Sequence, residues 1–177
     1  DGGNWDLACN SIHFIDLFSY FSGQLNISIN SSKLDKQILD SKRSGFIEFT
    51  GRLICTTNRG DSLIMNSSRF GDKPMVIYLA SKDQRYYINE YIDGNMYSKG
   101  KVISSFSIND WSWEENNLRM PFVSDLTCEA VNQILDTGNC DLPDINDSFK
   151  QHKPLIESLN NHLKMVTNNT YDICPIT

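Results

Sequence analysis

The sequence has no long apolar run and no concentrated patch of positive charge. A membrane-spanning helix needs roughly 20 predominantly apolar residues, and the longest candidate here, residues 12–21, is interrupted by Asp16 and other polar residues. The chain carries 16 Lys and Arg against 22 Asp and Glu, a net charge of -6. Because such a chain repels phosphate groups, nucleic acids and anionic membranes are poor partners for it. We expect no membrane span and no nucleic-acid binding.

Recognisable catalytic and metal-binding motifs are also missing. The chain has three histidines, His13, His152 and His162, and none stands in a familiar relation to a nucleophile. There is no nucleophile elbow, zinc-protease motif or Gly-rich phosphate loop, and no Cys-x-x-Cys pair of the kind that binds zinc. We therefore expect no catalytic residues, no metal and no cofactor, and the sequence favours binding over catalysis.

The composition is that of a globular protein. Of the 177 residues, 40% are hydrophobic and 21% charged, which is enough apolar material for a core and too little charge for a disordered chain. No repeat, low-complexity tract or Pro-rich linker marks a boundary. We predict a single domain over residues 1–177, with a strand-rich core at about 24–122 and a helical part at about 124–177.

The five cysteines are spread along the chain in the manner of disulfide partners. Cys128 and Cys140 lie within and just after a predicted helix, and closing a loop of this length is worth roughly 3 kcal/mol. Cys9 and Cys174 would tie the two chain ends together, which leaves Cys55 as a small buried thiol on a strand. Disulfides indicate an exported protein, extracellular or periplasmic. Five reduced cysteines in a cytosolic protein are the alternative.

Two further features agree with export. The chain begins at Asp1 rather than Met, which fits a processed mature protein or an excised domain, and equally a cloning boundary. It also contains Asn-x-Ser/Thr sequons, the acceptor sequence for N-glycosylation, although an Asn-rich and Ser-rich chain contains several by chance. The candidate glycosylation sites are Asn26, Asn30, Asn66, Asn146 and Asn168.

Alternating apolar and polar residues predict strands through the middle of the chain. The pattern is clear at 24–30 and returns from residue 45, with Phe49 and Leu53 on the apolar face and Glu48 and Thr50 on the polar face. Asp-Gly at 93–94 predicts a tight hairpin turn. Consecutive strands with short turns form an antiparallel meander, and we predict about 6–7 strands.

Apolar residues at helical spacing predict one N-terminal helix and two C-terminal helices. The first covers residues 5–21 and ends at Gly23, the second is capped by Ser124 and stops at Gly138, and the third begins with Pro154. Packed on the sheet, these helices give an α+β fold: a curved antiparallel sheet, flanked by helices and stabilised by disulfides.

Aromatic residues on a nominally exposed sheet face form the candidate partner-binding site. In the strand near residue 85, Tyr86, Ile88 and Ile92 share the apolar face, so Tyr87 and Tyr91 fall on the opposite one. Tyr and Trp are enriched at protein interfaces, whereas burial of this face under the terminal helices is the competing interpretation. The candidate partner-binding residues are Arg85, Tyr87, Tyr91, Trp111 and Trp113.

A second candidate surface is the tripeptide Arg59-Gly60-Asp61, an adhesion-type sequence at a predicted hairpin tip. The same residues are good turn formers, so turn chemistry alone explains their presence.

These observations predict an exported, non-catalytic recognition module that binds a protein partner through a sheet face or a free sheet edge. The first alternative is a domain that binds a small apolar ligand, or senses one, in a barrel-like cavity lined by Phe49, Leu53, Tyr86 and Ile88. The second is a secreted hydrolase, which needs a histidine within hydrogen-bond reach of a Cys, Ser or carboxylate.

Overall fold

The chain folds into two compact units. The computed structural model describes residues 1–70, 75–82, 84–90, 95–102, 115–119 and 121–176. One unit combines Asp1–Asp72 with Pro143–Thr177, and the other is Lys73–Leu142. We call them the terminal unit and the inserted unit, because the second interrupts the first in the sequence. The predicted single domain is not tested by this division, since two units can still unfold as one.

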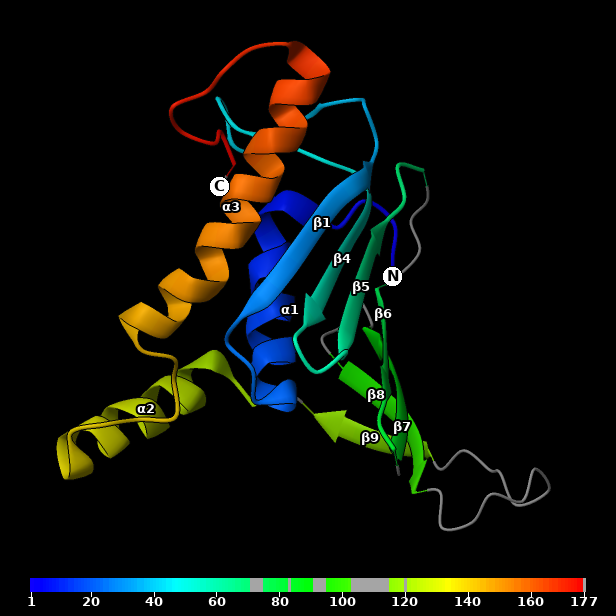
Figure 1. Cartoon of the computed structure of the whole chain (residues 1–177). Coiled ribbons are helices and arrows are strands. Elements are labelled where there is room, and N and C mark those ends of the chain that lie inside the picture. Colours follow the sequence, from blue (N-terminus) through cyan, green and yellow to red (C-terminus); the bar gives the residue numbers. More distant parts are fainter. Residues whose placement is uncertain (71–74, 83, 91–94, 103–114, 120, 177) are drawn as a thin grey trace. The chain divides into compact units, whose positions relative to one another are not determined.

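The terminal unit is a small antiparallel sheet covered by two helices. Its three-stranded sheet has the order β1-β4-β5, and β2 and β3 pair separately. Figure 1 shows α1 behind the three-stranded sheet and α3 alongside β1, and α3 contacts both β1 and α1. The elements are α1 (Leu7–Ser22), β1 (Ile27–Leu34), β2 (Leu39–Asp40), β3 (Ile47–Glu48), β4 (Gly51–Thr57), β5 (Ser62–Ser67) and α3 (Ile145–Thr167).

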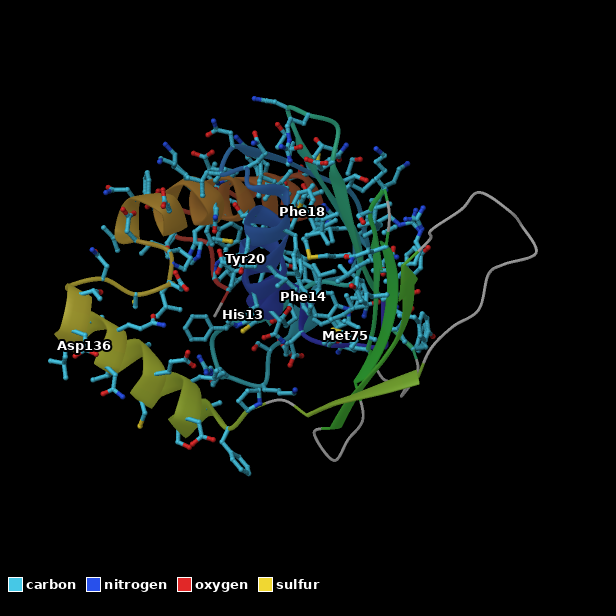
Figure 2. All side chains as sticks on the ribbon, turned by 90° about the horizontal axis from the view of Figure 1, so that it is seen from below. His13, Phe14, Phe18, Tyr20, Met75 and Asp136 are labelled. Carbon is cyan, nitrogen blue, oxygen red and sulfur yellow. The ribbon has the colours of Figure 1, made fainter. Side chains whose placement is uncertain are left out.

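The core of the terminal unit comes from all of these layers. Figure 2 shows Phe14 and Phe18 on the side of α1 that packs on the core, and His13 and Tyr20 on the opposite side. This division agrees with the helical spacing of apolar residues in the sequence. The most buried apolar side chains, all within 2% of complete burial, are Leu7, Ala8, Ile15, Phe49, Leu53, Cys55, Leu155, Leu159 and Leu163.

The start of α1 is capped by a residue from a distant strand. Asp6, the N-cap residue, makes no side-chain cap hydrogen bond. The buried Glu48 carboxylate accepts hydrogen bonds from the amides of Ala8 (2.8 Å) and Cys9 (3.2 Å) instead. Burial raises the pKa of Glu48, and these amide donors oppose the shift. Both Glu48 and Thr50 are buried, so their predicted place on a polar face is wrong: Glu48 caps α1, and the Thr50 hydroxyl donates to Asp35.

The inserted unit is a four-stranded antiparallel meander followed by a helix. Its strands pair in chain order, β6-β7-β8-β9, as the sequence predicts. Among residues 75–82, 84–88 and 121–142 of this unit, no side chain is buried. The elements are β6 (Val76–Ala80), β7 (Gln84–Glu90), β8 (Asn95–Val102), β9 (Glu115–Arg119) and α2 (Val123–Thr137).

The α+β class, the N-terminal helix, the two C-terminal helices and the antiparallel pairing are confirmed. The single curved sheet is wrong, because the nine strands of the described residues form three sheets, none of them closed. Packing of both C-terminal helices on a sheet is also wrong. Helix α3 packs on β1, whereas α2 has no buried residue.

Two predicted helix starts are wrong. Ser124 lies inside α2, which has no side-chain cap hydrogen bond. Helix α3 starts well before Pro154, because the Asp144 carboxylate accepts hydrogen bonds from the amides of Asn146 and Asp147. Asp144 is therefore the N-cap, and Pro154 lies in the helix interior, where its ring removes one backbone donor.

All five cysteines are free, so neither predicted disulfide is formed and stabilisation by disulfides has no support. Cys128 lies nine residues before the last residue of α2, Thr137, which is about 14 Å along a helix. A disulfide requires Cα atoms within about 7 Å of each other. Cys140 follows three residues after the helix, where the amide of Asp141 donates to the Gln133 side chain at 3.3 Å; the segment therefore folds back beside the last turns of α2, and Cys128 lies on an earlier turn.

Candidate binding surfaces

Two tyrosines form an exposed pair on the sheet of the inserted unit. Tyr78 on β6 and Tyr87 on β7 are directly opposite in the antiparallel register. Their side chains are 56% and 37% exposed, whereas Tyr86 and Ile88 are half-buried. Cross-strand partners have Cβ atoms only about 5 Å apart, so the two rings form one aromatic surface. The predicted facing of Tyr86, Ile88 and Tyr87 is confirmed. The sequence did not single out Tyr78, because its partner strand was unknown.

The other predicted partner-binding residues are placed differently. Arg85 donates hydrogen bonds from Nη1 to the carbonyls of Ser81 and Gln84, and it therefore braces the β6–β7 turn. Its guanidinium is held by its own hairpin. Three of the predicted residues lie outside the described part of the chain: Tyr91, Trp111 and Trp113.

Helix α2 carries an apolar side that is not buried. Leu135 is 76% exposed, and Leu126, Val131 and Ile134 are each close to half exposed. The charged residues of the helix are Asp125, Glu129 and Asp136, with no Lys or Arg among them. Helices that bind anionic membrane surfaces carry Lys and Arg on their polar side, so α2 does not fit that role. We predicted the apolar stripe from the sequence but expected the sheet to cover it.

The Arg59-Gly60-Asp61 tripeptide forms the turn between β4 and β5, as predicted. Both of its charges are used within the chain. The Arg59 guanidinium donates to the carbonyl of Ser22 and lies 3.3 Å from the Asp61 carboxylate. That carboxylate also accepts from the Thr57 hydroxyl at 2.9 Å. This geometry favours the turn-forming interpretation, and adhesion through the loop stays an untested prediction.

A pocket of about 490 Å³ lies in the terminal unit between α1, α3 and the C-terminal segment. Cys9 and Cys174 both line this pocket. The two thiols that were predicted to pair therefore lie at the same pocket, although they are not bonded. Most other lining residues are apolar: Ala8, Ile12, Leu155, Ile156, Ile173 and Ile176. The predicted barrel-like cavity is wrong, because the sheets are open and Phe49 and Leu53 are fully buried in the core.

The structure defines the polar neighbours of His152 and His162. His152 lines the pocket, and its Nε2 lies 3.9 Å from the Asp16 carboxylate, beyond hydrogen-bond distance. Burial raises the pKa of Asp16, and the nearby His152 and His13 oppose the shift. His162 is buried, with Nε2 2.9 Å from the carbonyl of Asp35. In the part of the chain that the structure describes, no histidine is hydrogen-bonded to a thiol, hydroxyl or carboxylate.

The thiol of Cys55 is completely buried in the core of the terminal unit. Burial raises the pKa of Cys55 to about 12, so this thiol is a packing residue, as predicted.

The sequon asparagines differ in accessibility. Asn26 and Asn30 on and before β1, Asn146 in the first turn of α3 and Asn168 at its end are exposed. Asn66 on β5 is half-buried, and its Oδ1 accepts a 2.6 Å hydrogen bond from Arg52.

No helix in the described part of the chain combines the length and the apolar character that crossing a membrane requires. Among the same residues, no three His, Cys, Asp or Glu side chains gather as a metal site would need. Comparison with protein-family models, curated proteins and solved structures found no match.

Proposed function

We propose that the chain is an exported, non-catalytic recognition module that binds a protein partner through the inserted unit. The observation that carries this proposal concerns residues 75–82, 84–88 and 121–142 of the inserted unit, none of which has a buried side chain. A unit with this many apolar residues gains little from folding alone, because apolar burial is the main stabilising term. A partner that covers the exposed side chains would supply the missing burial.

The Tyr78–Tyr87 pair is the part of this surface with the best-defined geometry. Two rings on neighbouring strands give a rigid, amphipathic contact area, the kind that dominates protein interfaces. In the order β6-β7-β8-β9, the outer strands are β6 and β9, and an extended segment can add to an outer strand. Arg85 supports this surface by bracing the turn, and Tyr91, Trp111 and Trp113 remain proposed contributors.

Site-specific photo-crosslinking tests the proposal. A photoreactive phenylalanine analogue at Tyr87 should give one adduct of defined mass with secreted or cell-surface proteins, and excess wild-type chain should abolish it. Tyr78→Ala in the same labelled chain should weaken the adduct about tenfold, because a central aromatic contributes roughly 1–2 kcal/mol at an interface. The matched control places the analogue at Ile64, an exposed residue of β5 in the terminal unit. Equal adducts from both positions, or none from Tyr87, would refute the proposal.

Export is part of the same proposal and has its own test. The spread of the cysteines and the exposure of four sequon asparagines support it. After expression through a eukaryotic secretory pathway, peptide mapping should find glycans at exposed sequons and none at Asn66, because its side chain is held by Arg52. Absence of any glycan together with five free thiols would count against export.

The pocket beside Cys9 and Cys174 supports a second candidate, binding of a small apolar ligand. Its volume of about 490 Å³ falls in the range of ligand sites, roughly 300–1,000 Å³. N-phenyl-1-naphthylamine, whose fluorescence rises in apolar surroundings, should bind the wild-type chain. Ile12→Trp should fill the pocket and abolish the signal, whereas Leu17→Trp, on the exposed side of α1, should not. Equal signals from the two variants would rule this candidate out.

A further inference from the structure

In the terminal unit, the outer strands of the three-stranded sheet are β1 and β5. They differ in what lies along their outer edges. On the β5 side, the N-terminal residues pair with the strand: the Gly2 amide donates to the carbonyl of Asn66 (3.2 Å), and the Ser68 amide donates to the carbonyl of Gly2 (3.0 Å). The indole of Trp5 donates to the same Asn66 carbonyl at 2.8 Å. The N-terminal residues therefore cover the C-terminal end of β5, and proteins commonly protect the edges of their sheets in this way.

On the opposite side, β1 pairs with β4 alone in the described residues. Its free side borders a groove of about 650 Å³, and the wall formed by the strand consists of six consecutive residues, 27–32. A run of consecutive residues means that the backbone edge of the strand lines the groove, since a sheet face would contribute every second residue. The opposite wall is one side of α3: Pro154, Glu157, Ser158, Asn161 and Met165.

Two hydrogen bonds fix the shape of this groove. The Ser31 hydroxyl donates to the carbonyl of Ser158 at 3.0 Å and so fastens α3 to the strand. The Ser32 amide donates to the Asn30 side chain at 2.9 Å, which covers one edge amide with a flexible, exposed group that a competing backbone carbonyl can replace. In Figure 1, α3 runs alongside β1 over much of the strand.

We propose that this β1–α3 groove binds an extended peptide segment of another protein, which adds to the sheet as a strand next to β1. An exposed strand edge offers a row of backbone donors and acceptors that only another extended backbone can match. The adjacent helix wall would contact alternate side chains of the added segment, which gives the site selectivity as well as backbone affinity.

The lining residues define the chemistry of the segment. Pro154 and Met165 provide apolar contacts at the two ends of the helix wall, so alternate residues of the segment that face α3 should be apolar. Glu157 is the only charged lining residue; its side chain is 62% exposed, and Lys153 lies 3.8 Å away. A Lys or Arg near the middle of the segment complements Glu157, whereas an acidic segment would be repelled by a chain of net charge -6.

This inference concerns a surface of the terminal unit and stands without the function proposed above. It also bears on glycosylation, because Asn30 is a sequon residue that lines the groove. A glycan there would occupy the place of the peptide. Occupancy of Asn30 and binding of the segment are therefore mutually exclusive.

The test uses the full chain without glycans, labelled with ¹⁵N, and a capped peptide of sequence KVTKTVKV as the probe. Its second, fourth, sixth and eighth residues (Val, Lys, Val, Val) share one face, so apolar side chains and a central Lys can face α3 together. The matched probe is the same peptide with N-methyl groups on alternate residues of one edge, which removes donors but keeps every side chain. The unmodified peptide should shift the amide resonances of residues 27–32 and of α3, and leave those of β5 and of β6–β9 unchanged. The N-methylated peptide should bind about tenfold more weakly or worse, because several backbone hydrogen bonds are lost.

Protein variants give an independent readout. Asn161→Trp should fill the groove and weaken binding of the probe at least tenfold, whereas Lys164→Trp, on α3 but outside the groove, should bind like the wild type; circular dichroism checks that both fold. Equal affinity for the two peptides, equal affinity of the two variants, or shifts confined to β6–β9 would overturn the inference. Shifts at β1 together with a failed crosslink at Tyr87 would overturn only the function proposed for the inserted unit.

Discussion

The two units use their apolar residues in opposite ways. In the terminal unit, two helices and a sheet bury thirteen apolar side chains in a common core, from Leu7 to Cys174. In the inserted unit, none of residues 75–82, 84–88 and 121–142 is buried, although they include apolar residues of the same types. The terminal unit therefore has a source of stability within itself. The inserted unit has the surface expected of a part that completes its burial with another molecule.

The first test has the largest expected effect. It makes the same substitution, Leu to Ala, once in each unit. Leu159→Ala removes a completely buried side chain of α3 and should lower the free energy of unfolding by about 4 kcal/mol. Leu135→Ala removes a side chain of α2 that is 76% exposed and should change it by less than about 0.5 kcal/mol. Urea titrations followed by circular dichroism measure both. A large loss from Leu135→Ala would show that the inserted unit has a core of its own.

The second test asks whether the terminal unit can be locked by its own thiols. Because Cys9 and Cys174 line one pocket, oxidation by glutathione disulfide should join them and raise the free energy of unfolding by about 3 kcal/mol. Non-reducing peptide mapping identifies the bond. Cys128→Ser serves as the control, since Cys128 does not line this pocket, and it should leave the increase unchanged. A Cys128–Cys140 bond as the first product would contradict the placement of these thiols.

The third test concerns Glu48, which joins β3 to the start of α1. Glu48→Ala leaves two helix amides without their acceptor and should lower the free energy of unfolding by about 2 kcal/mol. Because burial raises the pKa of Glu48 above its ordinary value of 4.5, its titration favours the folded state below that value and this advantage is lost as pH rises through the raised pKa. The stability of the wild type relative to Glu48→Gln should therefore fall between acidic and neutral pH. A relative stability that rises with pH would show that the amide donors outweigh burial.

The smallest expected effect compares the two helix starts. Asp144 caps α3 in the terminal unit through two amides at 2.7 and 2.8 Å, so Asp144→Ala should cost about 1 kcal/mol. Ser124→Ala in α2 should have almost no effect, because α2 has no side-chain cap hydrogen bond. Thermal unfolding of the two variants separates these outcomes. An equal loss of stability from both variants would show that Ser124 caps α2.

The sequence predicted those features that depend on neighbouring residues. The span of α1, its end at Gly23, the β4–β5 turn and the facing of Tyr87 all follow from local spacing and turn chemistry. Features set by distant residues were missed. The local alternation predicts Glu48 on the solvent-exposed face of a strand. Its hydrogen-bond partners, the amides of α1, are some forty residues away in the sequence, so the local pattern does not reveal them.

The candidate surfaces show the same limit. The pairing of Tyr78 with Tyr87 needs the register of two strands, which alternation within one strand does not provide. The groove beside β1 needs both the sheet order and the path of α3, a helix more than a hundred residues later in the chain. The exposed side of α2 was visible as a stripe in the sequence, but a stripe does not reveal whether anything covers it.

The interruption of the terminal unit by the inserted unit has a consequence for biosynthesis. The first part of the terminal unit leaves the ribosome before Lys73, yet Leu155, Leu159 and Leu163, which complete its core, follow only after the entire inserted unit. At roughly 5–20 residues per second, α1 and the three-stranded sheet must wait several seconds for α3. During that interval the apolar face that α3 will cover is open, and nascent-chain binding factors have their best opportunity to engage this protein.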